Sequence, residues 1–148
     1  MARTPDGAPS PFETLATLLR QAERRVDEAL RASLQPLELT PRQYALLSLL
    51  GETPMSQQEA SRRMGIDRTT MVGLVDGLEA AELVVRERHP SDRRAHVLVL
   101  SSTGDKRRKQ AARAVSQLEG EVLRGLDEKD LRRLGRALRS VAGQEESR

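Results

Sequence analysis

Residues 56–100 read SQQEASRRMGIDRTTMVGLVDGLEAAELVVRERHPSDRRAHVLVL, and the fold class can be inferred from this segment. It opens with two helical patterns separated by Gly65, which suits a tight turn because glycine tolerates a left-handed backbone. Ser56 and Glu59 have the spacing of a capping box at the start of the first helix. Asp67 can cap the second helix. The segment therefore predicts two short helices joined by a tight turn.

The second helix is expected to run from Arg68 to about Ala81. Apolar residues recur along it at three- and four-residue steps and should face the core: Met71, Leu74, Val75, Leu78 and Ala81. Near the helix start, four residues point away from that stripe: Arg68, Thr69, Thr70 and Gly73. Arginine can hydrogen-bond guanine or clamp a phosphate, and threonine can hydrogen-bond a base or touch a thymine methyl. These four residues are therefore the candidates for contact with base edges and phosphates.

After Glu82 the pattern changes to runs rich in β-branched residues, at 83–86 and 95–100. The runs flank a polar insert at 89–94, which predicts a two-stranded hairpin with a basic tip. Helix, turn, helix and basic hairpin follow the order of a winged helix-turn-helix, whose second helix enters the major groove of DNA. The hairpin, or wing, offers four arginines that a narrow minor groove would attract: Arg86, Arg88, Arg93 and Arg94. Asp92 is expected to orient a neighbouring arginine.

Helical patterns also flank this segment. Residues 12–34 carry an apolar stripe at helical spacing: Leu15, Leu18, Leu19, Ala22, Val26 and Leu30. Thr40 followed by Pro41 predicts the start of another helix, and Ser101 and Asp127 can cap two more. The chain is therefore expected to be mostly α, with six helices and a small two-stranded β wing.

Composition limits the function classes. The 148 residues include one Phe, one Tyr and no Cys, so the core must be aliphatic, and disulfides, thiolate metal sites and thiol catalysis are excluded. No segment approaches the roughly 20 apolar residues that span a bilayer, and the start MARTPDGAPSP lacks the apolar centre of a secretion signal. We therefore expect no membrane partner and a cytoplasmic location. Because residues 56–94 hold as many acids as arginines, DNA binding is inferred from their arrangement, not from excess charge.

Five short motifs occur in the order seen in the MarR family of transcriptional regulators, and the chain resembles that family from about Phe12 to Val141. They are Leu39-Thr40-Pro41-Arg42-Gln43-Tyr44, Ser56-Gln57-Gln58-Glu59, Asp67-Arg68-Thr69-Thr70-Met71-Val72, Leu74-Val75-Asp76-Gly77-Leu78-Glu79 and Asp92-Arg93-Arg94. The stretch at 89–104, which holds the tip of the wing and its second strand, is the most diagnostic part of the resemblance. The chain departs from the family pattern at Gly73, where Arg or Lys is common, at Glu82, where Gly is common, and at Ala60-Ser61, which replaces Leu-Ala. The second helix should therefore make fewer base contacts than is usual in the family, and more of the contact should come from Arg68, the threonines and the wing.

The resemblance implies a triangular homodimer that binds a pseudo-palindromic operator, commonly as a repressor. The helical patterns at 12–34 and 102–143 agree with a dimer, because their apolar stripes are too long for one small domain to bury. Packing of these stripes within one chain is the alternative. The expected organisation is a flexible tail at 1–11, one domain at 12–143 and a frayed end at 144–148. Within the domain we expect dimerisation helices at about 12–34 and 102–143, and the winged helix-turn-helix at about 41–100.

Release from DNA by a small aromatic or phenolic effector is a further implication of the resemblance. The effector cleft would lie between the dimerisation helices and the DNA-binding lobe. Tyr44, Arg20 and Arg24 are the available hydrogen-bonding groups there, although Tyr44 can equally be a core residue with its hydroxyl at the edge.

Metal, cofactor and enzyme functions are not expected. The two histidines, His89 and His96, flank the wing and are too few for a zinc site, which needs three or four convergent ligands. No nucleophile with a base, glycine-rich phosphate loop or carboxylate pair is found, and Ser56 is a helix cap. The competing hypothesis is a helical dimeric adaptor that binds protein and not DNA; such an adaptor has no use for Arg93 and Arg94.

Overall fold

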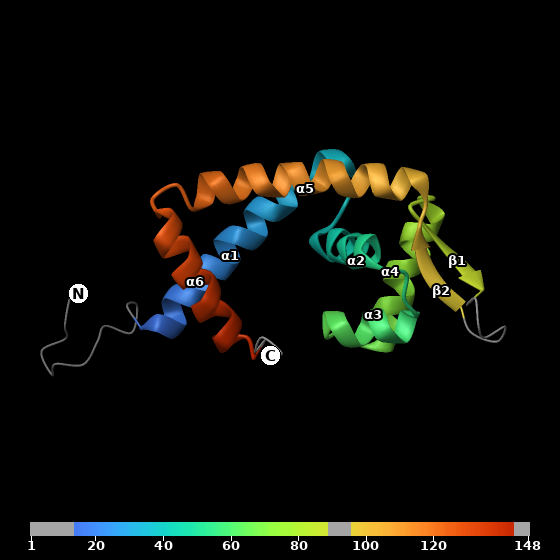
Figure 1. The fold of residues 1–148 in the computed structure, drawn as a ribbon, viewed down its shortest axis with the longest axis horizontal. Coiled ribbons are helices and arrows are strands. Elements are labelled where there is room, and N and C mark those ends of the chain that lie inside the picture. Colours follow the sequence, from blue (N-terminus) through green and yellow to red (C-terminus); the bar gives the residue numbers. More distant parts are fainter. Residues whose placement is uncertain (1–13, 89–95, 144–148) are drawn as a thin grey trace, which may run out of the picture.

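The protein is described here by a computed structural model that covers residues 14–88 and 96–143. Its elements are α1 (Leu15–Leu34), the short 3-10 helix η1 (Gln35–Leu37), α2 (Pro41–Glu52), α3 (Gln57–Met64), α4 (Arg68–Ala80), β1 (Val84–Arg88), β2 (His96–Leu100), α5 (Ser102–Val122) and α6 (Glu128–Val141). Helix α5 runs along the length of the molecule, with α1 and α6 towards one end and α2, α3, α4 and the hairpin at the other (Figure 1). We refer to α1 and α6 as the arm helices and to residues 41–100 as the lobe. The predicted fold, mostly α with a two-stranded wing, is confirmed.

Side-chain caps fix the starts of the helices. At α2, Thr40 Oγ1 accepts from the Gln43 N–H at 3.2 Å and Gln43 Oε1 accepts from the Thr40 N–H at 2.8 Å, a complete capping box. At α3, Ser56 accepts from the Glu59 N–H at 3.1 Å, but the Glu59 carboxylate pairs with Arg62. The predicted capping box at Ser56 is thus only half formed, because Arg62 offers a charged donor one turn along the helix. The other predicted caps are confirmed, namely Asp67, Ser101 and Asp127.

The core of the lobe is aliphatic. Its large buried side chains come mainly from α2, α4 and residues 83–100: Leu46, Leu47, Leu50, Met71, Val75, Leu78, Leu83, Val84 and Leu98. Helices α1, α3 and α5 add Leu34, Ala60 and Ala111. The predicted inward stripe of α4 is wrong at Ala81, which is exposed. The helix ends at Ala80, and Glu82 turns the chain away with φ 57°, in the left-handed region. The apolar face therefore stops at Leu78 and continues in β1.

The wing is joined firmly to the rest of the lobe. Strands β1 and β2 pair antiparallel, with Val84 opposite Leu100 and Arg88 opposite His96. The Leu98 N–H donates to the Met55 carbonyl at 2.8 Å, so the loop before α3 runs beside β2. This pairing covers part of the free edge of β2.

The start of α5 lies directly against the start of the wing. A Cβ on Gly104 would be 1.9 Å from the Leu83 carbonyl oxygen, so no other residue fits there unless the backbone moves. The Ser101 hydroxyl donates to the Glu82 carbonyl at 2.6 Å. The lobe and α5 therefore meet through a close backbone contact.

The arm helices leave much of their apolar surface uncovered. Leu15 and Val141 are 76% and 73% exposed, and Leu18 and Leu138 are 46% and 43% exposed. No residue of α6 is buried. Across the described ranges, 14–88 and 96–143, none of the helices has the length and apolar character needed to cross a membrane.

Candidate nucleic-acid interface

Helix α4 has one buried face and one exposed face. Met71, Val75 and Leu78 are fully buried against the lobe core. The opposite face exposes Arg68, Thr69, Val72, Gly73 and Asp76. We call these five residues the α4 outer face. A helix that is anchored by one apolar face, and presents one arginine and otherwise short side chains on the other, has the shape needed to enter a major groove.

Thr70 differs from its predicted role. It is half-buried, its N–H donates to Asp67 Oδ1 at 2.9 Å, and its hydroxyl donates to the other carboxylate oxygen. These hydrogen bonds hold the pKa of Asp67 below its usual value, with the Thr70 hydroxyl as the largest cause. Thr70 therefore completes the cap of α4, while Thr69 lies exposed beside it. Because its hydroxyl is bonded to Asp67, Thr70 is not part of the outer face.

Val72 was not among the predicted site residues. It lies on the α4 outer face and lines a hollow of about 620 Å³ between α3 and α4, together with Gln57, Gln58, Ser61, Arg68 and Met71. The sequence contained a signal, because Val72 falls outside the inward stripe at 71, 74, 75 and 78. An apolar residue outside the inward stripe of a helix is expected to be exposed.

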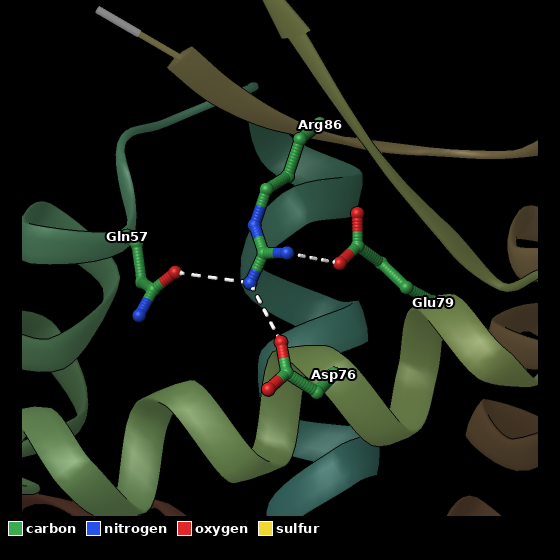
Figure 2. A network of polar contacts seen from close by, with 4 residues as sticks. All are labelled: Gln57, Asp76, Glu79 and Arg86. Carbon is green, nitrogen blue, oxygen red and sulfur yellow. Dashed lines mark hydrogen bonds and ion pairs between the residues drawn. The ribbon is translucent and has the colours of Figure 1, made fainter.

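Arg86 does not extend freely from the wing. Figure 2 shows its guanidinium, from β1, between two carboxylates of α4 and a side chain of α3. It donates to Asp76 at 2.9 Å, to Glu79, and to Gln57 Oε1 at 3.4 Å. The guanidinium therefore has internal partners, unlike the free DNA-contacting arginine that the sequence predicted. These partners favour a positioning role for Arg86 over the predicted DNA contact, which stays a prediction.

The Arg86 cluster, defined as Arg86, Gln57, Asp76 and Glu79, connects three elements of the lobe. Two carboxylates on α4 would repel phosphates near the outer face, and Arg86 offsets their charge. The same contacts fix β1 against α4, so the wing and the outer face keep one relative orientation. The cluster carries one positive and two negative charges, so Arg86 offsets one of the two carboxylate charges.

The other predicted wing residues lie at the end of β1 or outside the described residues. Arg88 is exposed at the last residue of β1, opposite His96. Asp92, Arg93, Arg94 and His89 lie outside the described residues.

The three predicted effector residues occupy two kinds of position. Tyr44 is half-buried and packs against the lobe core, whereas Arg20 and Arg24 are exposed one turn apart on α1. A hollow of about 410 Å³ lies where α1 approaches α2, but none of the three lines it. Its lining consists of Arg31, Ala32, Gln35, Glu38, Leu39, Thr40 and Pro41. In the part of the chain that the structure describes, no group of three or more His, Asp or Glu side chains could hold a metal ion.

Comparisons with known proteins agree with a winged helix-turn-helix regulator. Residues 37–95, which include α2, α3, α4 and β1, match the model of the MarR family. An uncharacterized HTH-type transcriptional regulator of Bacillus subtilis, YcgE, is 31% identical over 120 residues, which cover 80% of this chain and 78% of that protein.

Two solved structures of one regulator are also similar. CouR from Rhodococcus jostii RHA1, bound to p-coumaroyl-CoA, is 29% identical with a TM-score of 0.85, and the match covers 95% of this chain and all of that one. The transcriptional repressor CouR bound to a 23-mer DNA duplex is 32% identical with a TM-score of 0.82, over 91% of this chain and 99% of that one. With its winged helix-turn-helix lobe and these relatives, the chain belongs to the MarR family of transcriptional regulators.

Proposed function

We propose that this regulator is a homodimeric repressor that binds a pseudo-palindromic DNA operator. It is a transcriptional regulator and not an enzyme. The observation that carries the proposal is the α4 outer face, which stands beside the wing with the nearby carboxylates already paired to Arg86. The DNA-bound structure of the similar repressor CouR supports it. Since an operator is chromosomal, the protein acts in the cytoplasm.

In this proposal α4 enters the major groove and the wing follows the adjacent minor groove. Arg68 and Thr69 contact base edges and phosphates, and Gly73 lets the DNA approach the helix closely. Arg88, Arg93 and Arg94 contact the minor groove and its phosphates, and Asp92 orients one of these arginines. Thr70 contributes indirectly, through the cap of α4.

Dimerisation brings two lobes to one duplex. The exposed leucines of α1 and α6 supply an apolar surface that a second copy of the chain would cover. Two lobes related by twofold symmetry would read half-sites about 34 Å apart, one turn of the double helix.

An effector is the second part of the proposal. Similarity to CouR, which binds p-coumaroyl-CoA in one structure, supports an aromatic or phenolic effector. Tyr44, Arg20 and Arg24 remain the proposed binding groups, in a cleft completed at the dimer interface. Binding there would release DNA if it favoured an arrangement of the two lobes that does not match the operator.

The function is tested by selecting duplexes from a random library with the full-length protein and titrating the selected sequence at two salt concentrations. We expect affinity that falls steeply with salt and exceeds that for a scrambled duplex by at least about a thousandfold. Arg68→Ala should weaken operator binding by about 1 to 3 kcal/mol, while Arg31→Ala, a change to an exposed arginine of α1, should not. Equal, weak binding to both duplexes would contradict the proposal and favour the protein-binding adaptor.

A further inference from the structure

Val72 is an apolar residue in the middle of a surface that otherwise carries polar or very short groups. Its side chain is 37% exposed, although its neighbour Met71 is fully buried. Arg68 lies one turn before it and Asp76 one turn after it, both on the α4 outer face. A partner that fits against this face must therefore cover Val72.

The chemistry of Val72 restricts what it can recognise. It has no hydrogen-bonding group, and a β-branched side chain in a helix is held in essentially one rotamer, so its two methyl groups have fixed positions. Among the groups that base pairs present in the major groove, the thymine C5-methyl is the apolar one. A rigid pair of methyl groups therefore distinguishes thymine from cytosine, which lacks that methyl.

The neighbours of Val72 leave space for such a contact. Gly73 has no side chain, and a Cβ placed on it would find no atom within 4 Å. Asp76, which could otherwise reach for cytosine N4, is engaged by Arg86 at 2.9 Å. Of the α4 side chains beside Val72 on the outer face, only Arg68 is long, and it lies one turn before Val72.

We propose that Val72 determines operator specificity by contacting the C5-methyl group of one thymine in each half-site. This inference rests on the proposed function, because it requires α4 to lie in the major groove. It adds a specificity that the polar residues of the outer face do not supply.

The test uses the duplex selected by the full-length protein, with deoxyuridine replacing thymidine at one position at a time. This change removes only the methyl group and keeps the base pair. For the wild-type protein, one symmetric thymine pair should be sensitive, with affinity falling about fourfold per half-site and about fifteenfold when both methyls are removed, the effect of exposing one buried methyl at each site. Replacing that T·A pair by a 5-methylcytosine·guanine pair should weaken binding less than an unmethylated C·G pair does.

Two variants separate Val72 from other sources of methyl sensitivity. Val72→Ser should bind the thymine and deoxyuridine duplexes within about twofold of each other, because the buried methyl contact has gone. Val85→Ser changes a valine of similar exposure, 39%, on the wing and should keep the full wild-type sensitivity. Wild-type binding that is selective but insensitive to every thymine, or sensitivity that survives Val72→Ser, would overturn this inference alone. Failure to select any duplex would overturn the proposed function with it.

Discussion

The lobe and the arm helices are built from similar aliphatic residues, yet they end up in opposite environments. In the lobe, leucines, valines and a methionine of α2, α4 and the hairpin are almost completely buried. In α6 no residue is buried, and in α1 only Leu34, the residue next to the lobe, is. Because both patterns have helical spacing, periodicity alone cannot distinguish a finished core from a surface that awaits a partner. The lobe buries its apolar residues within one chain, whereas the arm helices leave theirs exposed, as the proposed dimer requires.

Helix α5 joins these two regions, and α1 also reaches the lobe, because its Leu34 is buried in the lobe core. Near its start, Arg107 donates to the Leu37 carbonyl, and Arg108 pairs with Asp105 at 2.8 Å. A Cβ on Gly51 of α2 would lie 2.6 Å from the Arg108 side chain, so α2 and α5 are in close contact. The first turns of α5 therefore pack against α2, whereas its later turns lie beside the arm helices (Figure 1).

The largest expected effect comes from charging the arm surface. The double substitution Leu18→Glu with Leu138→Glu should convert the dimer into folded monomers, because a buried carboxylate without a partner opposes association. Operator affinity should fall at least about a hundredfold, since the second lobe no longer adds its contacts. Sedimentation measures the oligomeric state, and circular dichroism checks the fold.

The control for the arm substitution is Val85→Glu, which charges an exposed apolar residue of the lobe and should leave the dimer intact. A double arm variant that remained dimeric would show that these leucines pack only within one chain.

The next effect concerns the junction between the lobe and α5. Gly104→Ala should lower the free energy of unfolding by about 3 kcal/mol, because the new Cβ overlaps backbone atoms of Leu83 that cannot simply rotate away. Gly73→Ala is the matched control, since nothing lies within 4 Å of its added Cβ, and it should raise stability by about 0.5 to 1 kcal/mol. Chemical denaturation measures both. If the two alanine variants were equally stable, the close contact at Gly104 would be refuted.

A smaller effect separates a positioning arginine from one that contacts DNA. Arg86→Met should weaken operator binding about tenfold, because Asp76 and Glu79 would then face the phosphates without compensation. Both this repulsion and the loss of a phosphate contact would weaken the salt dependence of binding, so the two roles are separated by removing the carboxylate charges. Adding Asp76→Asn and Glu79→Gln to Arg86→Met should restore much of the affinity. The absence of rescue would assign Arg86 to the DNA contact.

The smallest effect lies at the turn after α4. Glu82 has φ 57°, a conformation that glycine adopts without strain. Glu82→Gly should therefore raise the free energy of unfolding by about 0.5 to 1 kcal/mol. Glu82→Ala removes the same charge but keeps the strained backbone and should give no gain in the same denaturation experiment. Equal gains from both variants would mean that charge, and not backbone strain, is the cause.

Local features of the molecule could be predicted from the sequence, and features made by distant residues could not. The caps at Thr40, Asp67 and Ser101 act within one helical turn, so their spacing reveals them. Arg86 reaches partners 7, 10 and 29 residues away, and no local pattern shows that.

Thr70 and Val72 illustrate the same limit in the candidate site. Thr70 was predicted to face DNA from its residue type and position, but the cap uses it, and Val72 was not predicted as a site residue, but the outer face exposes it. The arm helices show the complementary case, because the sequence predicted their apolar stripes and the excess of that surface over what one chain can bury.

The central claim is that two copies of this chain read one duplex through their lobes. Sedimentation of the full-length protein with its selected operator tests it directly, at protein concentrations well above the dissociation constant. We predict two protomers per duplex, and loss of that complex when the spacing between half-sites changes by half a helical turn, about 5 base pairs. A complex of one protomer per duplex, or one that is indifferent to half-site spacing, would contradict the account.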